Sequence, residues 1–509
     1  PIQNISDCSM TTIRTRVAPS PTGDPHVGTA YMALFSMVHA HSQGGQFVLR
    51  IEDTDVARST SASSDNILSS LKWLGIEWDE GPDIGGPFGP YRQSERLDIY
   101  ARYATQLVEA GHAFPCFCTS ERLDAMRREQ QLAKETPRYD GHCLSLPPDE
   151  IAARVAANEP HVIRMRVPDE GACVIHDELR GDIEIDYTQV DMQVLVKTDG
   201  FPTYHLAVVV DDHLMEITDV IRGEEWIPSA PKHLLLSQYL GWEMPRLIHM
   251  PLLRNEDHSK LSKRKNATSI RYYERMGFLP EALLNFLGML GWSMPDQEEL
   301  FSVAEMQSNF DIRRISTGAP VFDAGKLTWL NGRWLRERMD DEEFADRISN
   351  WALNREQLLR VIPLVRERVD LFSQFAPMTT FLLEGLPEID AEALTVRGQT
   401  IDDVKRTLQF ALWRTEALSE WTRETLHQLY VDLAADMDLP IRDVLAAVFI
   451  AISGKPVSPP LFDSMAILGP DLTRARLRHA VTVAGGVSKK QLKKLEKDYR
   501  GLVPNDSEL

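Results

Sequence analysis

One histidine lies in a turn that prolines and glycines crowd from both sides. The stretch reads VAPSPTGDPHVGTA, with His26 directly after Pro25. We predict a strand over IRTRVAP and a helix that begins near HVGTA. The unpaired N–H groups and the positive dipole end at the start of a helix attract phosphate. The stretch therefore indicates a phosphate site, although a histidine at this place also fits a simple helix cap.

The glycines of this turn do not follow either of the two common nucleotide-binding patterns. Neither GxGxxG nor GxxxxGK[ST] is present, which disfavours a Rossmann fingerprint and a P-loop. Gly28 lacks a side chain, so a base or a ribose can approach the backbone closely at that position. The ligand site must therefore be of another kind.

A second stretch supplies positive charge. MPLLRNEDHSKLSKRKNATS carries Lys260, Lys263, Arg264 and Lys265, with Ser262 between them. Such a cluster fits an ordinary solvated surface when it is taken alone. Together with the first turn it supplies mobile cations for a polyphosphate whose position shifts during a reaction. The two stretches predict a nucleotide site.

The elements that must position these residues change in type along the chain. QFVLRIED and LAVVVDDHL are short, β-branched, apolar runs that end in acids and are typical of strands, whereas SSDNILSSLKWLG has helical spacing and a glycine stop. From PEALLNFLGMLGW onward apolar residues recur at three and four, as in LHQLYVDLAADM and IRDVLAAVFIAISG. A charge-rich, proline-punctuated stretch, ERLDAMRREQQLAKETPRYDGHC, looks like an insertion. We expect an α/β first half and a helical second half.

Composition indicates a large acidic chain of several domains. Its 509 residues exceed what one hydrophobic core usually organises, so roughly three to five domains are expected. No run of about eighteen apolar residues occurs, and the N-terminal stretch lacks the features of a signal peptide. We therefore expect a cytoplasmic protein without membrane contact and without disulfides. The net charge of −20 argues against a protein that coats nucleic acid.

The C-terminal segment is a local exception to this acidity. SKKQLKKLEKDYR concentrates six cations, namely Lys489, Lys490, Lys493, Lys494, Lys497 and Arg500. A surface for a polyanion and an ordinary solvated helix face both fit this run.

Three of the five cysteines lie close together in the insertion. They are Cys116 and Cys118 in FPCFCTS and Cys143 in RYDGHCLS. Clustered thiolates in a reducing compartment indicate tetrahedral Zn²⁺, and a structural metal suits a small insertion with little core of its own. His142 is the more usual zinc donor among the neighbouring residues. Free thiols without a metal are the alternative.

Two signatures resemble those of class I aminoacyl-tRNA synthetases. PHVGT is similar to the HIGH signature and KLSKR to the KMSKS signature. The stretches RVAPSPTGDPHVGTA, FVLRIEDTD, YRQSER, VVVDDHLMEITDVIRGEEW and VFDAGKLTWLNGRWL resemble the bacterial glutamyl-tRNA synthetase family along almost the whole chain. The resemblance implies that L-glutamate is joined to tRNA(Glu) with ATP and Mg²⁺, by a protein that we expect to be a monomer.

The family also implies an architecture, a multidomain α/β plus all-α fold. A split Rossmann-type nucleotide-binding domain carries an α+β insertion and is followed by a helical anticodon-binding half. We place the catalytic domain at residues 1–95 and 204–258, the acceptor-binding insertion at 96–203, a stem-contact domain with the KLSKR loop at 259–339, and the anticodon-binding region, in two subdomains, at 340–509.

The chemistry requires charge stabilisation more than proton transfer. The α-carboxylate of an amino acid is ionised at neutral pH, so its attack on the α-phosphorus of ATP needs no general base. We expect His26 and Lys263, assisted by Lys260, to stabilise the charge that builds on the phosphoryl oxygens. The resemblance implies an ATP site made by His26, Gly28, Thr29, Lys260, Ser262, Lys263 and Arg264.

An acidic substrate calls for guanidinium groups, which meet a carboxylate with two parallel hydrogen bonds. The family positions that line the glutamate site match Arg16, Ser20, Glu52, Tyr204 and Arg222, where Glu52 would hold the ammonium group. Each of the five also has an ordinary interpretation, such as a strand edge, a turn or core. Position 208 is valine where some relatives carry asparagine, which puts a polar contact there in doubt.

The resemblance reaches two further sites. It gives Tyr139 as the fourth metal ligand beside Cys116, Cys118 and Cys143. It gives Arg368, in a predicted helix, as the residue that reads the third anticodon base and so favours charging of tRNA(Glu) alone. Relatives often carry arginine where this chain has Phe449, so one anticodon contact is missing or replaced.

Several alternatives belong to other classes. A non-discriminating enzyme would also charge tRNA(Gln), and a glutaminyl enzyme would carry a β-barrel in place of the helical half. A truncated tRNA-modifying relative would lack that half, and a small nucleotidyltransferase would lack KLSKR. A non-catalytic RNA-binding paralogue is expected to have lost His26 or Lys263, and both are present.

Overall fold

The computed structural model describes residues 12–23, 25–55, 59–135, 137–261, 268–395, 398–455 and 459–502. The chain divides into two compact units. The first is Pro1–Ile270 with Pro280–Asn331, and the second is Arg271–Leu279 with Gly332–Leu509. The finer division into a split catalytic domain, an insertion and a stem-contact domain stays a prediction.

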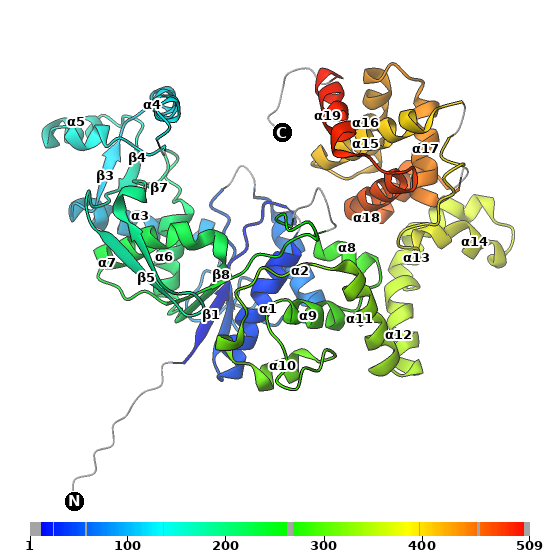
Figure 1. Ribbon diagram of the computed structural model, residues 1–509, viewed down its shortest axis with the longest axis horizontal. Helices are drawn as coiled ribbons and strands as arrows, with labels where there is room; N and C mark the ends of the chain where they lie inside the picture. The colour runs from blue at the N-terminus through cyan, green and yellow to red at the C-terminus, as the bar shows by residue number, and fades with distance from the viewer. Residues whose placement is uncertain are drawn as a thin grey trace, which may run out of the picture. The chain divides into compact units, whose positions relative to one another are not determined.

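Parallel strands form the centre of the first unit (Figure 1). Strand β1 (Arg14–Val17) pairs in parallel with β2 (Gln46–Leu49), and β8 (Asp219–Gly223) pairs in parallel with β9 (Arg246–Met250). The two pairs meet because the Thr218 N–H donates to the carbonyl of Arg14 over 2.9 Å. Strand β5 (Ala172–Asp177) continues the sheet beside β9 and pairs antiparallel with β6 (Gly181–Asp186). Ligands bind at the carboxyl ends of such parallel strands.

Helix α1 (Val27–Ser42) passes through the core of this unit. It packs against β1 and against α9 (Pro280–Met289) and α10 (Val303–Asn309). Burial on several sides explains why its apolar residues are not confined to one stripe. The predicted order of strand, turn and helix is confirmed, and the turn between β1 and α1 holds His26.

The segment LAVVVDDHL forms a helix and not the predicted strand. It lies in α6 (Tyr204–Leu214), where every residue from Leu206 to Asp212 is buried. Valine costs a helix only about 0.5 kcal/mol, whereas full burial of such a side chain contributes about 1.5–3 kcal/mol. Because the helix is covered on several sides by α3 (Leu97–Glu109), α7 (Ala230–Leu240) and β7 (Val194–Val196), packing outweighs the β-preference.

Residues of the YRQSER stretch hold helix α6 in place by hydrogen bonds to its buried Asp211. The Asp211 carboxylate accepts hydrogen bonds from Gln93 Nε2 (2.9 Å), Arg96 Nε (2.8 Å) and the Tyr100 hydroxyl (2.7 Å). A buried carboxylate needs such donors to offset its lost hydration. The acids that end LAVVVDD are therefore internal anchors at the end of a helix.

Helix α2 (Ser61–Leu74) is confirmed with its glycine stop, since Gly75 adopts φ 76°. Helices α8 (Ile270–Arg275) and α11 (Ala324–Glu337) each carry residues of both units.

A small three-stranded antiparallel sheet forms the body of the predicted insertion (Figure 1). Its strands are β3 (Ala113–Cys116), β4 (Val162–Met165) and β7, in the order β3–β4–β7. Helices α4 (Ser120–Leu132) and α5 (Pro148–Ala156) contain no buried residue. The core beside β3 consists of Phe114, Cys116, Tyr139 and Cys143, which is small for a stable module.

The described part of the second unit consists of helices without a strand, as the spacing of apolar residues predicts. They are α12 (Asp341–Ala352), α13 (Arg355–Val365), α14 (Phe375–Thr379), α15 (Ile401–Ala417), α16 (Arg423–Asp436), α17 (Ile441–Ser453), α18 (Leu461–Val483) and α19 (Lys489–Leu502). Their core gathers around α18, which packs against α15, α16 and α17. No helix among the described residues combines the length and the apolar character that crossing a membrane requires.

Candidate active site and metal centre

A cavity of about 400 Å³ opens at the carboxyl ends of β1 and β8 in the first unit. Its walls include eight of the residues selected from the sequence, namely Arg16, His26, Gly28, Thr29, Glu52, Tyr204, Arg222 and Lys260. Ser20 is exposed and does not contribute to the described wall. Ser262, Lys263 and Arg264 lie outside the described residues. The cavity thus brings together the predicted phosphate turn and most of the predicted glutamate site.

His26 is both the cap of helix α1 and part of the cavity wall. Its Nδ1 accepts a hydrogen bond from the Gly28 N–H over 2.9 Å, which confirms that His26 caps the helix. Because Nδ1 accepts, a neutral ring carries its proton on Nε2. The cap thus fixes the tautomer that donates a hydrogen bond from Nε2, and a phosphate oxygen can accept such a bond.

Gly28 is required for this cap as well as for access. A Cβ at position 28 would lie 3.1 Å from His26 Nδ1, which is closer than most real Cβ contacts. A side chain there would displace the imidazole and crowd the cavity. The absence of a side chain at position 28 therefore allows the His26 ring to keep its orientation.

The start of the KLSKR segment is held by an asparagine that the sequence did not single out. The buried Asn255 donates from Nδ2 to Ser259 Oγ (2.9 Å) and to the carbonyl of Lys260 (3.0 Å). Lys260 itself is exposed at the cavity edge. Asn255 therefore fixes the backbone where the cationic loop begins.

A network of buried charges lies beneath one wall. Asp212 accepts from Arg16 Nε (3.1 Å) and from Arg50 Nη1 (2.8 Å), and Arg50 Nη2 donates to Glu52 over 3.2 Å. Arg50 is fully buried and its guanidinium is surrounded by these acids. Arg16 is therefore already neutralised by a partner within the protein.

Glu52 is the acid whose charge is most sensitive to its surroundings. Burial raises the pKa of its carboxyl to about 7, although Arg50 and Arg16 lower it. Its side chain is 12% exposed and lies on the cavity wall. Glu52 thus changes its charge near neutral pH, next to the place where a ligand would sit.

Arg222 lies on the wall near Tyr204 and has a different environment. It donates from Nε to His249 Nε2 (2.9 Å) and from Nη1 to His233 Nδ1 (3.1 Å) and to the Tyr204 hydroxyl (3.4 Å). The ring of Trp226 packs over Tyr204 at 4.4 Å between centroids. Burial lowers the pKa of Arg222, yet a guanidinium stays charged at neutral pH.

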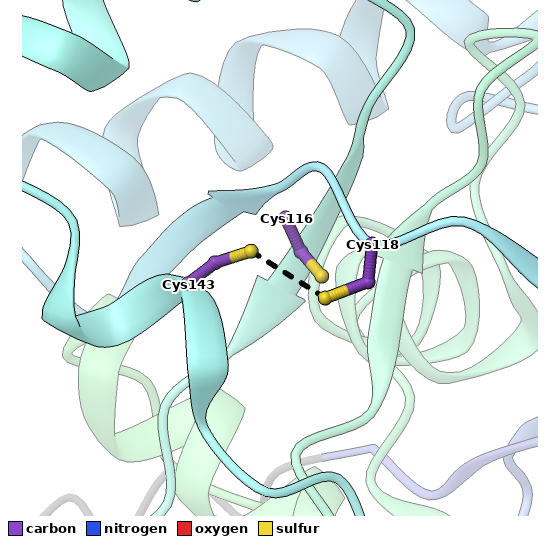
Figure 2. A group of neighbouring side chains, drawn as sticks. All are labelled: Cys116, Cys118 and Cys143. Carbon is purple, nitrogen blue, oxygen red and sulfur yellow. Dashed lines mark hydrogen bonds between the residues drawn. The ribbon is translucent and has the colours of Figure 1, made fainter. Parts of the chain in front are cut away.

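The three cysteines of the insertion converge, as Figure 2 shows. Their sulfur atoms lie within 4.8 Å of one another, and those of Cys118 and Cys143 are 3.6 Å apart. The Tyr139 hydroxyl lies 3.4 Å from Cys116 Sγ and 3.5 Å from Cys118 Sγ. His142 is exposed in a 3-10 turn. The tyrosine therefore completes the group of facing side chains.

These separations fit a metal ion. Tetrahedral zinc, with bonds of about 2.3 Å to sulfur and about 2.0 Å to oxygen, holds sulfurs about 3.8 Å apart and sulfur and oxygen about 3.5 Å apart. Burial raises the pKa of the Cys116 thiol, but hydrogen bonds from Tyr139, the Cys118 backbone and Arg164 outweigh it and lower that pKa. A metal binds the thiolate form, so a lowered pKa of the thiol favours metal binding.

Family models match both units. The catalytic domain of class I tRNA synthetases (E and Q) matches residues 12–329, and an anticodon binding domain matches residues 343–481.

Relatives match nearly the whole chain. The glutamate–tRNA ligase of Cellvibrio japonicus (strain Ueda107) is 58% identical over 493 residues, covering 97% of this chain and 98% of the relative. That of Pseudomonas aeruginosa (strain UCBPP-PA14) is 58% identical over 495 residues, covering 97% and 100%. The chain belongs to the glutamate–tRNA ligase family of class I aminoacyl-tRNA synthetases.

The solved structures agree with this membership. A glutamate–tRNA ligase from Elizabethkingia meningosepticum CCUG26117, in complex with its amino acid, matches with 32% identity and a TM-score of 0.63, covering 93% of this chain and 99% of that chain. A glutamate–tRNA synthetase from Elizabethkingia anophelis matches with 33% identity and a TM-score of 0.63, covering 93% and 100%. The predicted family, fold class and ligase activity are confirmed.

In the second unit of this synthetase, Arg368 is exposed beyond the end of α13. Residues Arg366–Arg368 form a 3-10 turn and not part of the predicted α-helix, as is common where an α-helix ends. Phe449 packs partly buried against the core of that unit. In the first unit, Val208 is buried in α6 and does not contribute to the described wall of the cavity.

Sequence reasoning missed the supporting residues of this synthetase. Arg50, Asp212, His249 and Asn255 position the predicted ones but do not belong to a phosphate or carboxylate pattern of their own. One signal was available, because Arg50 stands two residues before Glu52 in the predicted strand QFVLRIED, where both would share a face. His249 gave no local signal, since its partner Arg222 is on a neighbouring strand.

Proposed function

We propose that this ligase is a discriminating enzyme that attaches L-glutamate to tRNA(Glu) alone, through a glutamyl-adenylate. The observation that supports the substrate most is the meeting of Arg222, Glu52 and the capped His26 on one cavity. A guanidinium suits the side-chain carboxylate of glutamate, and Glu52 suits its ammonium group. A histidine donor at a helix start suits the phosphates of ATP.

In the first step, a carboxylate oxygen of glutamate attacks the α-phosphorus of ATP. A phosphorus–oxygen bond forms to glutamate, and the bond from the α-phosphorus to the bridging oxygen breaks, so pyrophosphate leaves. His26 donates from Nε2 to the phosphoryl oxygens while negative charge builds on them. Lys260 and, from the sequence, Lys263 neutralise the departing pyrophosphate. The neutral tautomer of His26 suits this role because it donates without needing a proton from solvent.

ATP is bound, in this proposal, by the turn and the cationic loop together. Gly28 and Thr29 line the cavity beside His26, while Ser262 and Arg264 are assigned from the sequence alone. Bound Mg²⁺ would neutralise part of the phosphate charge. No residue is assigned to it.

In the second step, the 2′-hydroxyl of the terminal adenosine of tRNA attacks the activated carbonyl. A carbon–oxygen bond forms to the ribose, and the bond from the carbonyl carbon to the phosphate oxygen breaks, so AMP leaves with its electrons and the hydroxyl proton passes to AMP or to solvent. Arg16, Tyr204 and Arg222 would keep the glutamate in place during this transfer, with Ser20 as a further neutral contact assigned from the sequence.

We propose that Cys116, Cys118, Cys143 and Tyr139 hold a structural Zn²⁺. The separations of their sulfur and oxygen atoms support four-coordinate binding. The ion would cross-link β3 to the turn that carries Cys143 and so stabilise a module with a small apolar core.

Discrimination between tRNAs is assigned to Arg368. Its exposure and its place in the unit that carries the anticodon-binding match support contact with an anticodon base. An arginine fork prefers one base edge, so it would admit tRNA(Glu) and reject tRNA(Gln). The protein is proposed to act as a monomer in the cytoplasm.

Substitution of Arg222 tests the glutamate site. Arg222→Gln keeps neutral hydrogen-bonding groups but removes the charge, so we expect the KM for glutamate to rise about a hundredfold. The KM for ATP, measured in the same ATP–pyrophosphate exchange assay with tRNA present, should change less than about twofold. Equal increases in both constants would instead assign Arg222 a structural role.

A further inference from the structure

Arg222 differs from the other arginine of the cavity in its partners. Arg16 donates to the Asp212 carboxylate over 3.1 and 3.3 Å, which cancels much of its charge. Arg222 donates to two imidazoles, those of His249 and His233. Among the described residues, no carboxylate lies within ion-pairing distance of Arg222. Its positive charge is therefore not cancelled by a direct ion pair with a described residue, and Asp212 acts on it only from beyond that distance.

Each imidazole is held in the tautomer that accepts from Arg222. Asp177 Oδ2 lies 2.7 Å from His249 Nδ1, so Nδ1 carries the proton and Nε2 is free to accept. His233 accepts at Nδ1, and its Nε2 lies 3.2 Å from His205 Nδ1, to which it can donate. Burial and the charge of Arg222 lower the pKa values of His249 and His233, which keeps both rings neutral.

One nitrogen of the same guanidinium has no partner in the described protein. Arg222 Nη2 is buried without a hydrogen bond, and the residue is only 6% exposed. A buried unpaired donor on a charged group is costly unless a ligand completes it. Because Arg222 lies on the cavity wall, this donor fits an anionic group bound in the cavity.

We propose that His249, oriented by Asp177, and His233, oriented by His205, are positioning residues that hold Arg222 in one geometry without neutralising its charge. These two neutral imidazoles, which we call the neutral clamp, leave the charge of Arg222 available, so the cavity selects a carboxylate over a carboxamide of the same shape. A carboxylate partner would fix the guanidinium equally well but would compete with the substrate. This inference rests on the proposed role of Arg222 in binding the side chain of glutamate.

Replacing His249 tests the clamp in the full-length enzyme with tRNA present. His249→Leu removes the acceptor, so we expect the KM for glutamate in pyrophosphate exchange to rise about tenfold to a hundredfold while the KM for ATP changes less than about twofold. His249→Gln restores an acceptor oxygen and should keep the KM for glutamate within about threefold of the wild type. His233→Leu removes the other acceptor and should independently raise the KM for glutamate.

A matched control separates positioning from loss of stability. His39 is also a buried histidine paired with an aspartate, since its Nε2 lies 3.2 Å from Asp219 Oδ1, but it is not on the cavity wall. His39→Leu should lower the unfolding temperature without changing the KM for glutamate. If His249→Leu and His233→Leu leave that KM unchanged while Arg222→Gln raises it, the clamp is refuted and the glutamate site stands. If Arg222→Gln has no effect, both proposals are refuted.

An independent observation concerns α19, whose two faces differ. In a helical projection the six cations of the C-terminal run fall within about 140° of arc. All six are exposed, and none of them makes an ion pair with a described residue. The opposite face carries Tyr499, which packs at 5.2 Å from Phe410 and 5.1 Å from Trp413 between ring centroids. The helix is thus held by one face and leaves the basic face outward.

The position of this basic face points to RNA. It lies on a chain with a net charge of −20, and it follows the segment 343–481 that the anticodon-binding model matches. Lys490, Lys493 and Lys497 span about 10 Å of helix, which suits successive phosphates of one strand. We infer that the basic face of α19 contacts the sugar–phosphate backbone of bound tRNA and adds affinity without reading sequence.

Two triple variants of the intact enzyme test this contact. Replacement of Lys490, Lys493 and Lys497 by Gln should weaken tRNA(Glu) binding and reduce the slope of log Kd against log salt by about two to three. Replacement of the same three residues by Arg keeps the charge and should preserve both values. The KM values for glutamate and ATP should not change. If the Gln variant keeps the wild-type Kd and slope, the basic face is only solvated surface.

Discussion

The ionisation of the Glu52 carboxyl group predicts how activity and stability depend on pH. Its pKa of about 7 results from burial that Arg50 and Arg16 only partly offset. In the proposed glutamate site, only the ionised form of Glu52 would pair with the ammonium group of glutamate. The raised pKa also affects the free energy of unfolding. Because the carboxyl group ionises less readily in the folded state than in the unfolded state, Glu52 contributes stability at low pH, and this contribution is lost as the pH rises toward 7.

We therefore predict that kcat/KM for glutamate falls about tenfold for each pH unit below 7, because this constant reports the free enzyme. Measurement of pyrophosphate exchange between pH 5.5 and 8 checks this, at ATP concentrations well above its KM. In Glu52→Gln the constant should be low throughout and no longer depend on Glu52. A wild-type profile identical in shape to that of the variant would contradict the assignment.

At the scale of single residues, eight of the residues selected from the sequence line one cavity, whereas the residues that support them were not selected. His26, Arg16 and Arg222 occur in stretches whose residue types already suggest phosphate and carboxylate binding. Asp212 and His249 act through residues that are distant in sequence, so their roles depend on tertiary packing. The role of His26 as a cap was recognised as an alternative, and the structure shows that the cap orients its ring.

At the scale of elements, we expect the stability of the insertion to depend on the cluster of Cys116, Cys118 and Cys143 more than on its small apolar core. We predict that Cys116→Ser lowers bound zinc from about one equivalent to nearly none and loosens the insertion, because oxygen is a weaker zinc donor than thiolate. Metal analysis of the purified protein and limited proteolysis check this. Cys173→Ser is the matched control, since Cys173 is also buried but lies in β5, outside the cluster.

The fourth ligand can be identified separately. Tyr139→Phe removes the hydroxyl that lies 3.4 and 3.5 Å from two of the sulfurs, so it should weaken zinc retention against a chelator. His142→Ala should leave retention unchanged because that side chain is exposed. Wild-type protein without zinc would refute the site, and the reverse order of the two variants would make His142 the ligand.

Element types were predictable where spacing and burial agree. The helical half and the strand–turn–helix around His26 are confirmed because their apolar residues recur with a clear period. LAVVVDDHL was predicted wrongly because a helix buried on several sides has no polar stripe and reads like a buried strand. The signal that could have corrected this prediction is the pair Asp211 and Asp212. Gln93 of the YRQSER stretch donates to Asp211, and Arg50 donates to Asp212.

At the scale of the whole molecule, the catalytic-domain match covers residues 12–329 and the anticodon-binding match covers residues 343–481, so the proposed discrimination is assigned to the second unit. We predict that Arg368→Gln raises charging of tRNA(Gln) relative to tRNA(Glu) by about tenfold to a hundredfold, which is the usual value of one bidentate base contact. Pyrophosphate exchange with saturating tRNA(Glu) should be almost unchanged. A uniform loss with both tRNAs would mean that Arg368 binds the backbone and not a base.

The attachment of labelled glutamate, and separately of labelled glutamine, to purified tRNA(Glu) and tRNA(Gln) tests the central claim most directly. We predict that glutamate is attached to tRNA(Glu) and that the other three combinations remain at background. Attachment of glutamate to both tRNAs would contradict the role of Arg368, and attachment of glutamine would contradict a cavity built around an Arg222 that has no carboxylate partner in the protein.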